Sequence, residues 1–165
     1  MNPSAELEAA LEAAARAADI ARSLYQRNLE VRIKADRTPV TEADVRCELA
    51  IREVLEARFP AYGFFGEETD PRDLSAESVW LVDPIDGTKA FVREYPFFST
   101  QIALLRGGEI VLGVSSAPVY GDLAQRERDR HACRGDPVGG ELEVARGERS
   151  LAALREARGL SLIHI

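Results

Sequence analysis

The stretch Trp80-Leu81-Val82-Asp83-Pro84-Ile85-Asp86-Gly87-Thr88 decides how this chain is interpreted. Residues 79–82 form a short apolar run, which is typical of a buried strand. Pro84 restricts the residue before it to extended geometry, so Asp83 continues the strand to its end. The pair Asp86-Gly87 then indicates a turn. The pattern predicts a strand that ends in two aspartates whose side chains face one point.

A short helix is expected to follow this turn, beginning at Gly87-Thr88 and running through Phe91. The first N–H groups of a helix have no partner within the helix, and they can bind an anion. An isolated Asp-Gly-Thr would be no more than a turn and a helix cap. Attached to the strand, Pro84 and a second aspartate, it indicates metal ligands followed directly by a cradle for phosphate.

Five of the carboxylates within residues 67–86 are candidates for a shared site: Glu67, Glu68, Asp70, Asp83 and Asp86. The sequence Gly66-Glu67-Glu68 is expected to leave a second short strand, near the end of the first. Carboxylates brought together raise one another's pKa or require a cation. Mg²⁺ fits a site with few carboxylates, water and phosphate oxygens, and the carbonyl of Ile85 is expected to face the same point. The cluster predicts a site for a hard divalent cation that assists phosphoryl chemistry.

The rest of the chain predicts helices followed by strands. A helix is expected over residues 4–28 with Ser4 as its N-cap. A second helix is expected to begin at Thr41, where Thr41-Glu42-Ala43-Asp44 has the spacing of a capping box, and to end at Phe59-Pro60. Strands are expected at 99–106 and 109–116, because the Gly107-Gly108 pair between them favours a tight hairpin.

This order of elements predicts an α+β fold, in which two helices pack on a mainly antiparallel sheet. Residues 1–159 are expected to form one metal- and phosphate-binding domain. Beyond residue 124 the pattern weakens: the charged run 125–130 is interpreted as a solvated strand or loop, and 147–158 as a short helix. Residues 160–165 are interpreted as an artefactual tail.

The amino-acid composition argues against several classes of protein and site. A net charge of -7 disfavours unspecific binding to nucleic acid or anionic membranes. The start of the chain lacks the pattern of a signal peptide, and no apolar run is long enough to span a bilayer. The two cysteines, Cys47 and Cys133, favour a reducing, cytoplasmic setting over a disulfide framework. His131 and His164 lack the spacing of zinc ligands.

The nine-residue stretch 80–88 matches the signature motif of the inositol monophosphatase family. Gly66-Glu67-Glu68-Thr69 and Thr41-Glu42-Ala43-Asp44 resemble two further motifs of that family, so the resemblance covers roughly residues 5–120. It implies the layered α–β sandwich of the sugar phosphatases. It also implies a Mg²⁺-dependent phosphomonoesterase that acts on a small phosphorylated metabolite and commonly forms homodimers.

The resemblance implies a metal site with two or three Mg²⁺ ions. Glu67, Asp83 and the carbonyl of Ile85 would hold one ion, and Asp83 with Asp86 would contribute to a second. Glu67 is therefore placed among both the metal ligands and the catalytic residues. Glu68 is expected outside the ligand set, either behind it or on the surface.

The resemblance also implies roles next to the metal. Thr88 and Asp44 would position the attacking water and help to deprotonate it, although a capping role alone is the alternative for Asp44. The phosphate of the substrate would be bound by Asp86, Gly87 and Thr88. Lys34 matches a lysine that lies near the site in the family.

The residues after the motif favour one branch of the family. Lys89 and Phe91 resemble the histidinol-phosphatase and phosphonucleotidase branches, and nucleotidases usually carry Glu where Ala90 stands. Ile102-Ala103-Leu104 and Ser116-Ala117-Pro118 resemble the bacterial histidinol phosphatases. Histidinol phosphate is therefore the expected substrate, and inositol phosphate is the alternative.

Two other interpretations compete with this one. Haloacid-dehalogenase phosphatases use Asp-x-Asp, whereas here two residues separate Asp83 from Asp86 and one of them is Pro84. The other alternative is an inactive metal-binding fragment. Family members are longer and carry a later Trp-Asp motif, whereas Trp80 is the only tryptophan of this chain. Because that motif supplies a metal ligand, the chain is interpreted as truncated at its C-terminus, and we expect weak or no turnover from it as written.

Overall fold

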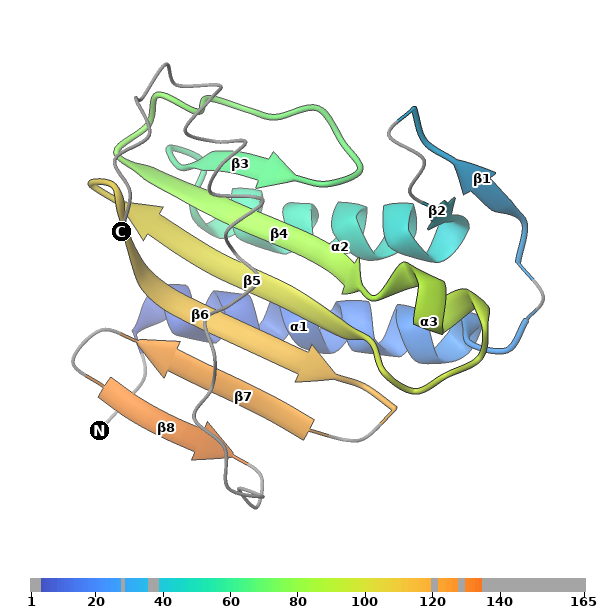
Figure 1. Cartoon of the computed structure of the whole chain (residues 1–165). Helices are drawn as coiled ribbons and strands as arrows, with labels where there is room; N and C mark the ends of the chain where they lie inside the picture. Colours follow the sequence, from blue (N-terminus) through green and yellow to red (C-terminus); the bar gives the residue numbers. More distant parts are fainter. Residues whose placement is uncertain (1–3, 28, 36–38, 120–121, 128–129, 135–165) are drawn as a thin grey trace, which may run out of the picture.

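A computed structural model describes residues 4–27, 29–35, 39–119, 122–127 and 130–134. Its helices are α1 (Ala5–Leu24), α2 (Glu42–Arg58) and α3 (Thr88–Val92). Its strands are β1 (Val31–Ile33), β2 (Pro39–Thr41), β3 (Gly63–Gly66), β4 (Ser78–Asp86), β5 (Ser99–Arg106), β6 (Glu109–Ala117), β7 (Asp122–Glu127) and β8 (Arg130–Arg134). Figure 1 shows α1 and α2 together on one face of a large twisted sheet.

The large sheet has the strand order β3-β4-β5-β6-β7-β8. β3 runs parallel to β4, and every other neighbouring pair is antiparallel. β5 and β6 meet in the tight hairpin that the sequence predicts, because Gly107 and Gly108 both have positive φ, 58° and 88°. β1 and β2 form a separate antiparallel ribbon. The predicted α+β class with two helices on a mainly antiparallel sheet is confirmed.

α1 packs closely because its buried face consists mostly of alanines. Ser4 caps it, accepting a hydrogen bond from the backbone N–H of Leu7 at 3.1 Å. Small side chains let α1 lie against α2 and against β5 and β6. The thiol of Cys47 on α2 lies 3.4 Å from the carbonyl oxygen of Ala17. The apolar core lies between these two helices and the sheet.

α2 begins where β2 ends and is the element that reaches the site. Thr41 is its N-cap, and the capping box with Asp44 forms as predicted. In Figure 1 the start of α2, the ribbon β1–β2, α3 and the end of β4 all lie at the same edge of the sheet. Residues from four separate segments therefore meet where β4 ends.

Some expected elements are longer in the structure than predicted, and others fall on residues that the structure does not describe. The predicted strand at 79–82 is longer, running from Ser78 to Asp86 through Pro84. The charged run 125–130 contributes to β7 and β8. The helix expected at 147–158 and the tail 160–165 lie outside the described residues. Among the helices that the structure describes, none has the length and apolarity needed to cross a bilayer.

Candidate active site at the end of strand β4

The end of β4 is irregular, and this sets the direction of its two aspartates. β4 and β5 pair regularly up to Asp83, and the register shifts between Asp83 and Asp86. Pro84 has no N–H for the ladder, and its carbonyl accepts a hydrogen bond from the hydroxyl of Thr100 at 2.9 Å. Residues three apart in a regular strand point to opposite faces. Because the register shifts between Asp83 and Asp86, their side chains are not held to opposite faces. The Asp86 carboxylate lies close enough to Asp83 to raise its pKa.

Asp83 is a half-buried residue whose carboxylate is surrounded by other carboxylates. Burial, followed by the charges of Glu67 and Asp86, raises the pKa of Asp83 to about 8. Within the described part of the chain, the buried Oδ1 atom of Asp83 has no hydrogen-bond partner. A buried acceptor without a partner is destabilising by about 1–3 kcal/mol. This oxygen therefore needs a proton or a cation beside it.

Lys34 joins the acidic segment that follows β3. Its Nζ lies 2.7 Å from Oε1 of Glu68 and 3.3 Å from Oε1 of Glu67. Burial alone would lower the pKa of Lys34, but the hydrogen bonds to these two carboxylates raise it. Burial raises the pKa of Glu68 to about 6, although Lys34 opposes the change. The Glu68 side chain is 5% exposed, so the expected surface position is wrong for Glu68 and a position behind the ligands fits.

Asp44 uses both of its carboxylate oxygens. Oδ2 accepts hydrogen bonds from the Thr41 backbone N–H at 2.8 Å and from the Thr41 hydroxyl at 2.6 Å. Oδ1 accepts a hydrogen bond from the Thr88 hydroxyl at 3.0 Å, and that hydroxyl also lies 3.1 Å from the carbonyl oxygen of Ile85. Burial raises the pKa of Asp44, whereas the hydrogen bonds from Thr41 and Thr88 lower it. One carboxylate is thus shared between the cap of α2 and the start of α3.

The predicted site residues thus come from four segments, and we call Asp44, Glu67, Glu68, Asp83 and Asp86 the acidic cluster. Glu67, Asp86 and Asp44 all act on the pKa of Asp83. Taken as they stand in the described ranges, no three His, Cys, Asp or Glu side chains surround a single point closely enough to hold a metal ion. Glu67 is instead turned towards Lys34 and is 45% exposed. Glu67 nevertheless lies close enough to Asp83 for its charge to raise the pKa of that carboxyl group.

Glu48 is a functional candidate that none of the sequence motifs contains. It lies one turn after Asp44 on α2 and is 0% exposed. Its carboxylate accepts hydrogen bonds from the backbone N–H groups of Glu68 and Thr69, each at 2.7 Å. It also accepts one from the Thr69 hydroxyl at 2.6 Å. The signal in the sequence is its position: Glu48 falls inside the apolar stripe that contains Cys47 and Ile51.

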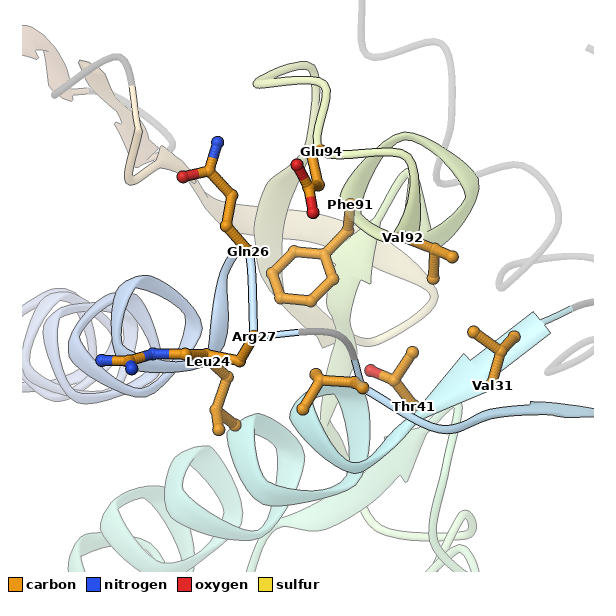
Figure 2. Close-up of a pocket in the computed structure, with 9 residues that line it drawn as sticks. Leu24, Gln26, Arg27, Val31, Thr41, Phe91, Val92 and Glu94 are labelled. Carbon is orange, nitrogen blue, oxygen red and sulfur yellow. The ribbon is translucent and has the colours of Figure 1, made fainter.

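Two hollows lie near the acidic cluster, and only one contains cluster residues. A hollow of about 290 Å³ opens at the end of β4, lined by Asp86, Gly87, residues 96–99, Ser115 and Ala117. A second hollow of about 160 Å³ lies between the end of α1, α3 and β1, and Phe91, Thr41 and Val31 are among the residues that line it (Figure 2). No carboxylate of the acidic cluster is among the residues that line the second hollow. The first hollow is therefore the better place for a substrate.

Gly87 links β4 to α3, and its replacement by alanine is expected to destabilise the fold. Its φ is 102°, a region that side chains disfavour, and an added Cβ would lie 2.8 Å from the carbonyl oxygen of Phe97. We expect Gly87→Ala to lower the free energy of unfolding by about 1–3 kcal/mol. Urea unfolding followed by circular dichroism measures this change.

Gly113→Ala is the matched control. Gly113 lies in β6, and a Cβ built there meets no described atom within 4 Å. Its substitution should change the free energy of unfolding by less than about 1 kcal/mol. Equal effects of the two substitutions would contradict the strain that we assign to Gly87.

Comparison with known proteins gives one consistent family. The model of the inositol monophosphatase family matches residues 2–161. A histidinol-phosphatase from Chlorobaculum parvum is 42% identical over 135 residues, which are 81% of this chain and 52% of that protein. An inositol-1-monophosphatase from Rhizobium meliloti is 40% identical over 102 residues, 61% of this chain and 38% of that protein.

Comparison with solved structures also finds similarity over most of this chain. The extragenic suppressor protein suhB from Bartonella henselae has a TM-score of 0.73 to this structure at 29% identity, covering 95% of this chain and 67% of that one. The chain spans about half the length of the curated relatives it matches. The similarity therefore extends over nearly all of this chain but over only part of each relative.

Proposed function

The chain belongs to the inositol monophosphatase family, and from this premise we propose that it is the metal- and phosphate-binding part of a Mg²⁺-dependent phosphomonoesterase. The observation that carries the proposal is Asp83. Its buried Oδ1 has no partner among the described residues, and two further carboxylates lie close enough to raise its pKa. A divalent cation would compensate all three groups at once.

The donor set fits Mg²⁺ better than a softer metal. Glu67, Asp83 and Asp86 offer carboxylate oxygens, and Ile85 offers a carbonyl oxygen, which are the ligands of a hard cation. We propose that Glu67, Asp83 and the Ile85 carbonyl hold one ion and that Asp83 and Asp86 share in a second, with two or three ions in all. When bound, Mg²⁺ supplies the positive charge that stabilises a phosphoryl group during transfer.

Thr88 and Asp44 are proposed to prepare the attacking water. When the Thr88 hydroxyl donates its proton to Oδ1 of Asp44, its oxygen is free to accept a hydrogen bond from a water molecule. The two residues then form a path along which the water can pass a proton to a carboxylate. Burial raises the pKa of Asp44, which makes this carboxylate a stronger base than an exposed aspartate.

The phosphate is proposed to enter the hollow at the end of β4. Asp86 and Gly87 line this hollow, and Thr88 begins α3 directly after them. The N–H groups of Gly87 and Thr88 would donate to phosphate oxygens in this place. Lys34 contacts Glu67 and Glu68 and neutralises part of their charge.

We propose histidinol phosphate as the substrate. The residues after the motif support this choice, as does the histidinol-phosphatase from Chlorobaculum parvum, 42% identical over 81% of this chain. Inositol phosphate is the second candidate, supported by the Rhizobium meliloti inositol-1-monophosphatase. We also propose a cytoplasmic location and a homodimer for the whole protein, on the cysteine content and the family resemblance respectively.

Release of inorganic phosphate with and without Mg²⁺ tests the activity and the choice of substrate. We expect histidinol phosphate to be hydrolysed at least tenfold faster than inositol 1-phosphate, and EDTA to stop both reactions. The rates are expected to be low, because the chain spans about half the length of its relatives. Preference for inositol phosphate would select the second candidate. Equal hydrolysis with EDTA present would contradict the metal-dependent mechanism.

A further inference from the structure

Glu48 binds the segment that follows β3 at three points, and this segment carries Glu67. We propose that Glu48 is a positioning residue, which holds Glu67 beside Asp83 and so sets the affinity of the metal site. The inference rests on the proposed function, because it takes Glu67 to be a metal ligand. It concerns a residue that would touch neither metal nor substrate.

The three hydrogen bonds fix the backbone directly after Glu67. The N–H groups of Glu68 and Thr69 and the hydroxyl of Thr69 all donate to the Glu48 carboxylate, at 2.6–2.7 Å. Before Glu67, the chain is held by the pairing of Gly66 with Val82 in β4. Glu67 thus lies between two anchors. Its side chain is 45% exposed and contacts Lys34, whereas its backbone is placed by these two anchors.

Gly66 shows how closely the two elements approach. A Cβ at this position would lie 2.2 Å from Oε1 of Glu48 and 2.3 Å from its carboxylate carbon. Only a glycine leaves room for the carboxylate to reach the amides of Glu68 and Thr69. The close approach at Gly66 and the hydrogen bonds from Glu68 and Thr69 both place the Glu48 carboxylate against the same segment.

Asp44 and Glu48, one turn apart on helix α2, therefore contact two different segments of the site. Asp44 contacts Thr88 at the end of β4, and Glu48 contacts the segment after β3. One turn further, Arg52 donates hydrogen bonds to the hydroxyl of Thr69 and to the carbonyl oxygen of Asp70, both at 2.9 Å. Because a helix is rigid, it fixes the distance between Glu67 and the residues around Thr88.

Mg²⁺ binding to the 165-residue chain, measured by calorimetry, tests this role. Glu48→Gln keeps the shape of the side chain but places an NH₂ group against a backbone N–H, so the segment can no longer be held at all three points. We expect Mg²⁺ affinity to fall about tenfold, as is typical when the residues that support metal ligands are changed. Exchange of the Glu68 and Thr69 amide protons should become faster in the same variant.

Val54→Ala separates positioning from stability. Val54 is buried on the same helix, so its truncation should lower the melting temperature while leaving Mg²⁺ affinity unchanged. If Glu48→Gln does not fold, Thr69→Val decides: it removes the hydroxyl donor, and we expect Mg²⁺ affinity to fall about threefold.

Unchanged Mg²⁺ affinity in a folded Glu48→Gln variant would overturn the inference while leaving the proposed function intact. If Glu48→Gln does not fold, unchanged Mg²⁺ affinity in Thr69→Val would likewise overturn the inference and leave the proposed function intact. A chain that binds no Mg²⁺, or whose binding survives Asp83→Asn, would refute the proposed function itself, and the role of Glu48 with it.

Discussion

Asp83→Asn is expected to abolish detectable Mg²⁺ binding and, in metal-free buffer, to raise the melting temperature of the chain. The affinity should fall at least hundredfold, because the substitution removes a proposed ligand of two ions. Calorimetry with Mg²⁺ measures the first effect. Thermal unfolding in EDTA near pH 7.5 measures the second.

The gain in stability follows from the surroundings of Asp83. Its Oδ1 is buried without a partner within the described residues, and Glu67 and Asp86 lie close enough to raise its pKa. Asparagine is neutral, and its NH₂ group can donate to one of these carboxylates. We expect about 1–3 kcal/mol of added stability, which is a rise in melting temperature of about 2–4 °C for each kcal/mol in a chain of this size.

Asp70→Asn is the matched control. Asp70 belongs to the same acidic stretch of sequence but is exposed, so its substitution should alter neither Mg²⁺ affinity nor stability by a measurable amount. A metal-free Asp83→Asn variant that is less stable than the parent would contradict the repulsion assigned to the cluster. Such a result would mean that the Asp83 carboxylate is stabilised in the fold without a cation.

The elements that the sequence predicts best are those with strong local signals. The capping box at Thr41–Asp44 and the Gly107-Gly108 hairpin both form as expected, because helix caps and tight turns depend on residues near in sequence. The full length of β4 was less predictable. Its continuation through Pro84 to Asp86 depends on pairing with β5, and a proline usually ends a strand within a sheet.

The site shows the same division between local and distant interactions. Glu67, Asp83 and Asp86 could be named because they lie in short motifs, although their metal-binding roles remain predictions. Glu48 has no such motif, and its partners are twenty and twenty-one residues away along the chain. A charged residue among the apolar positions of α2 was the available signal. Such a residue must find partners when it is buried, but the sequence alone does not say where they lie.

Asp44→Asn and Thr41→Ala are expected to separate the two uses of the Asp44 carboxylate. Both donors from Thr41 reach the same oxygen, Oδ2, whereas Thr88 reaches Oδ1. An asparagine that keeps its oxygen at the Oδ2 position therefore keeps the cap of α2. Its NH₂ group then faces Thr88 as a donor, so the side chain can no longer accept the proton of the Thr88 hydroxyl.

We expect Asp44→Asn to slow phosphate-ester hydrolysis at least hundredfold while changing the free energy of unfolding by less than about 0.5 kcal/mol. Thr41→Ala should do the reverse: it weakens the cap by about 0.5–2 kcal/mol and leaves hydrolysis within about tenfold of the parent. Single-turnover reactions with the chain in excess over histidinol phosphate make slow rates measurable, and urea unfolding gives the stabilities. If Asp44→Asn loses stability like Thr41→Ala but hydrolyses the ester at the parent rate, Asp44 is a helix cap alone and the proton path through Thr88 is wrong.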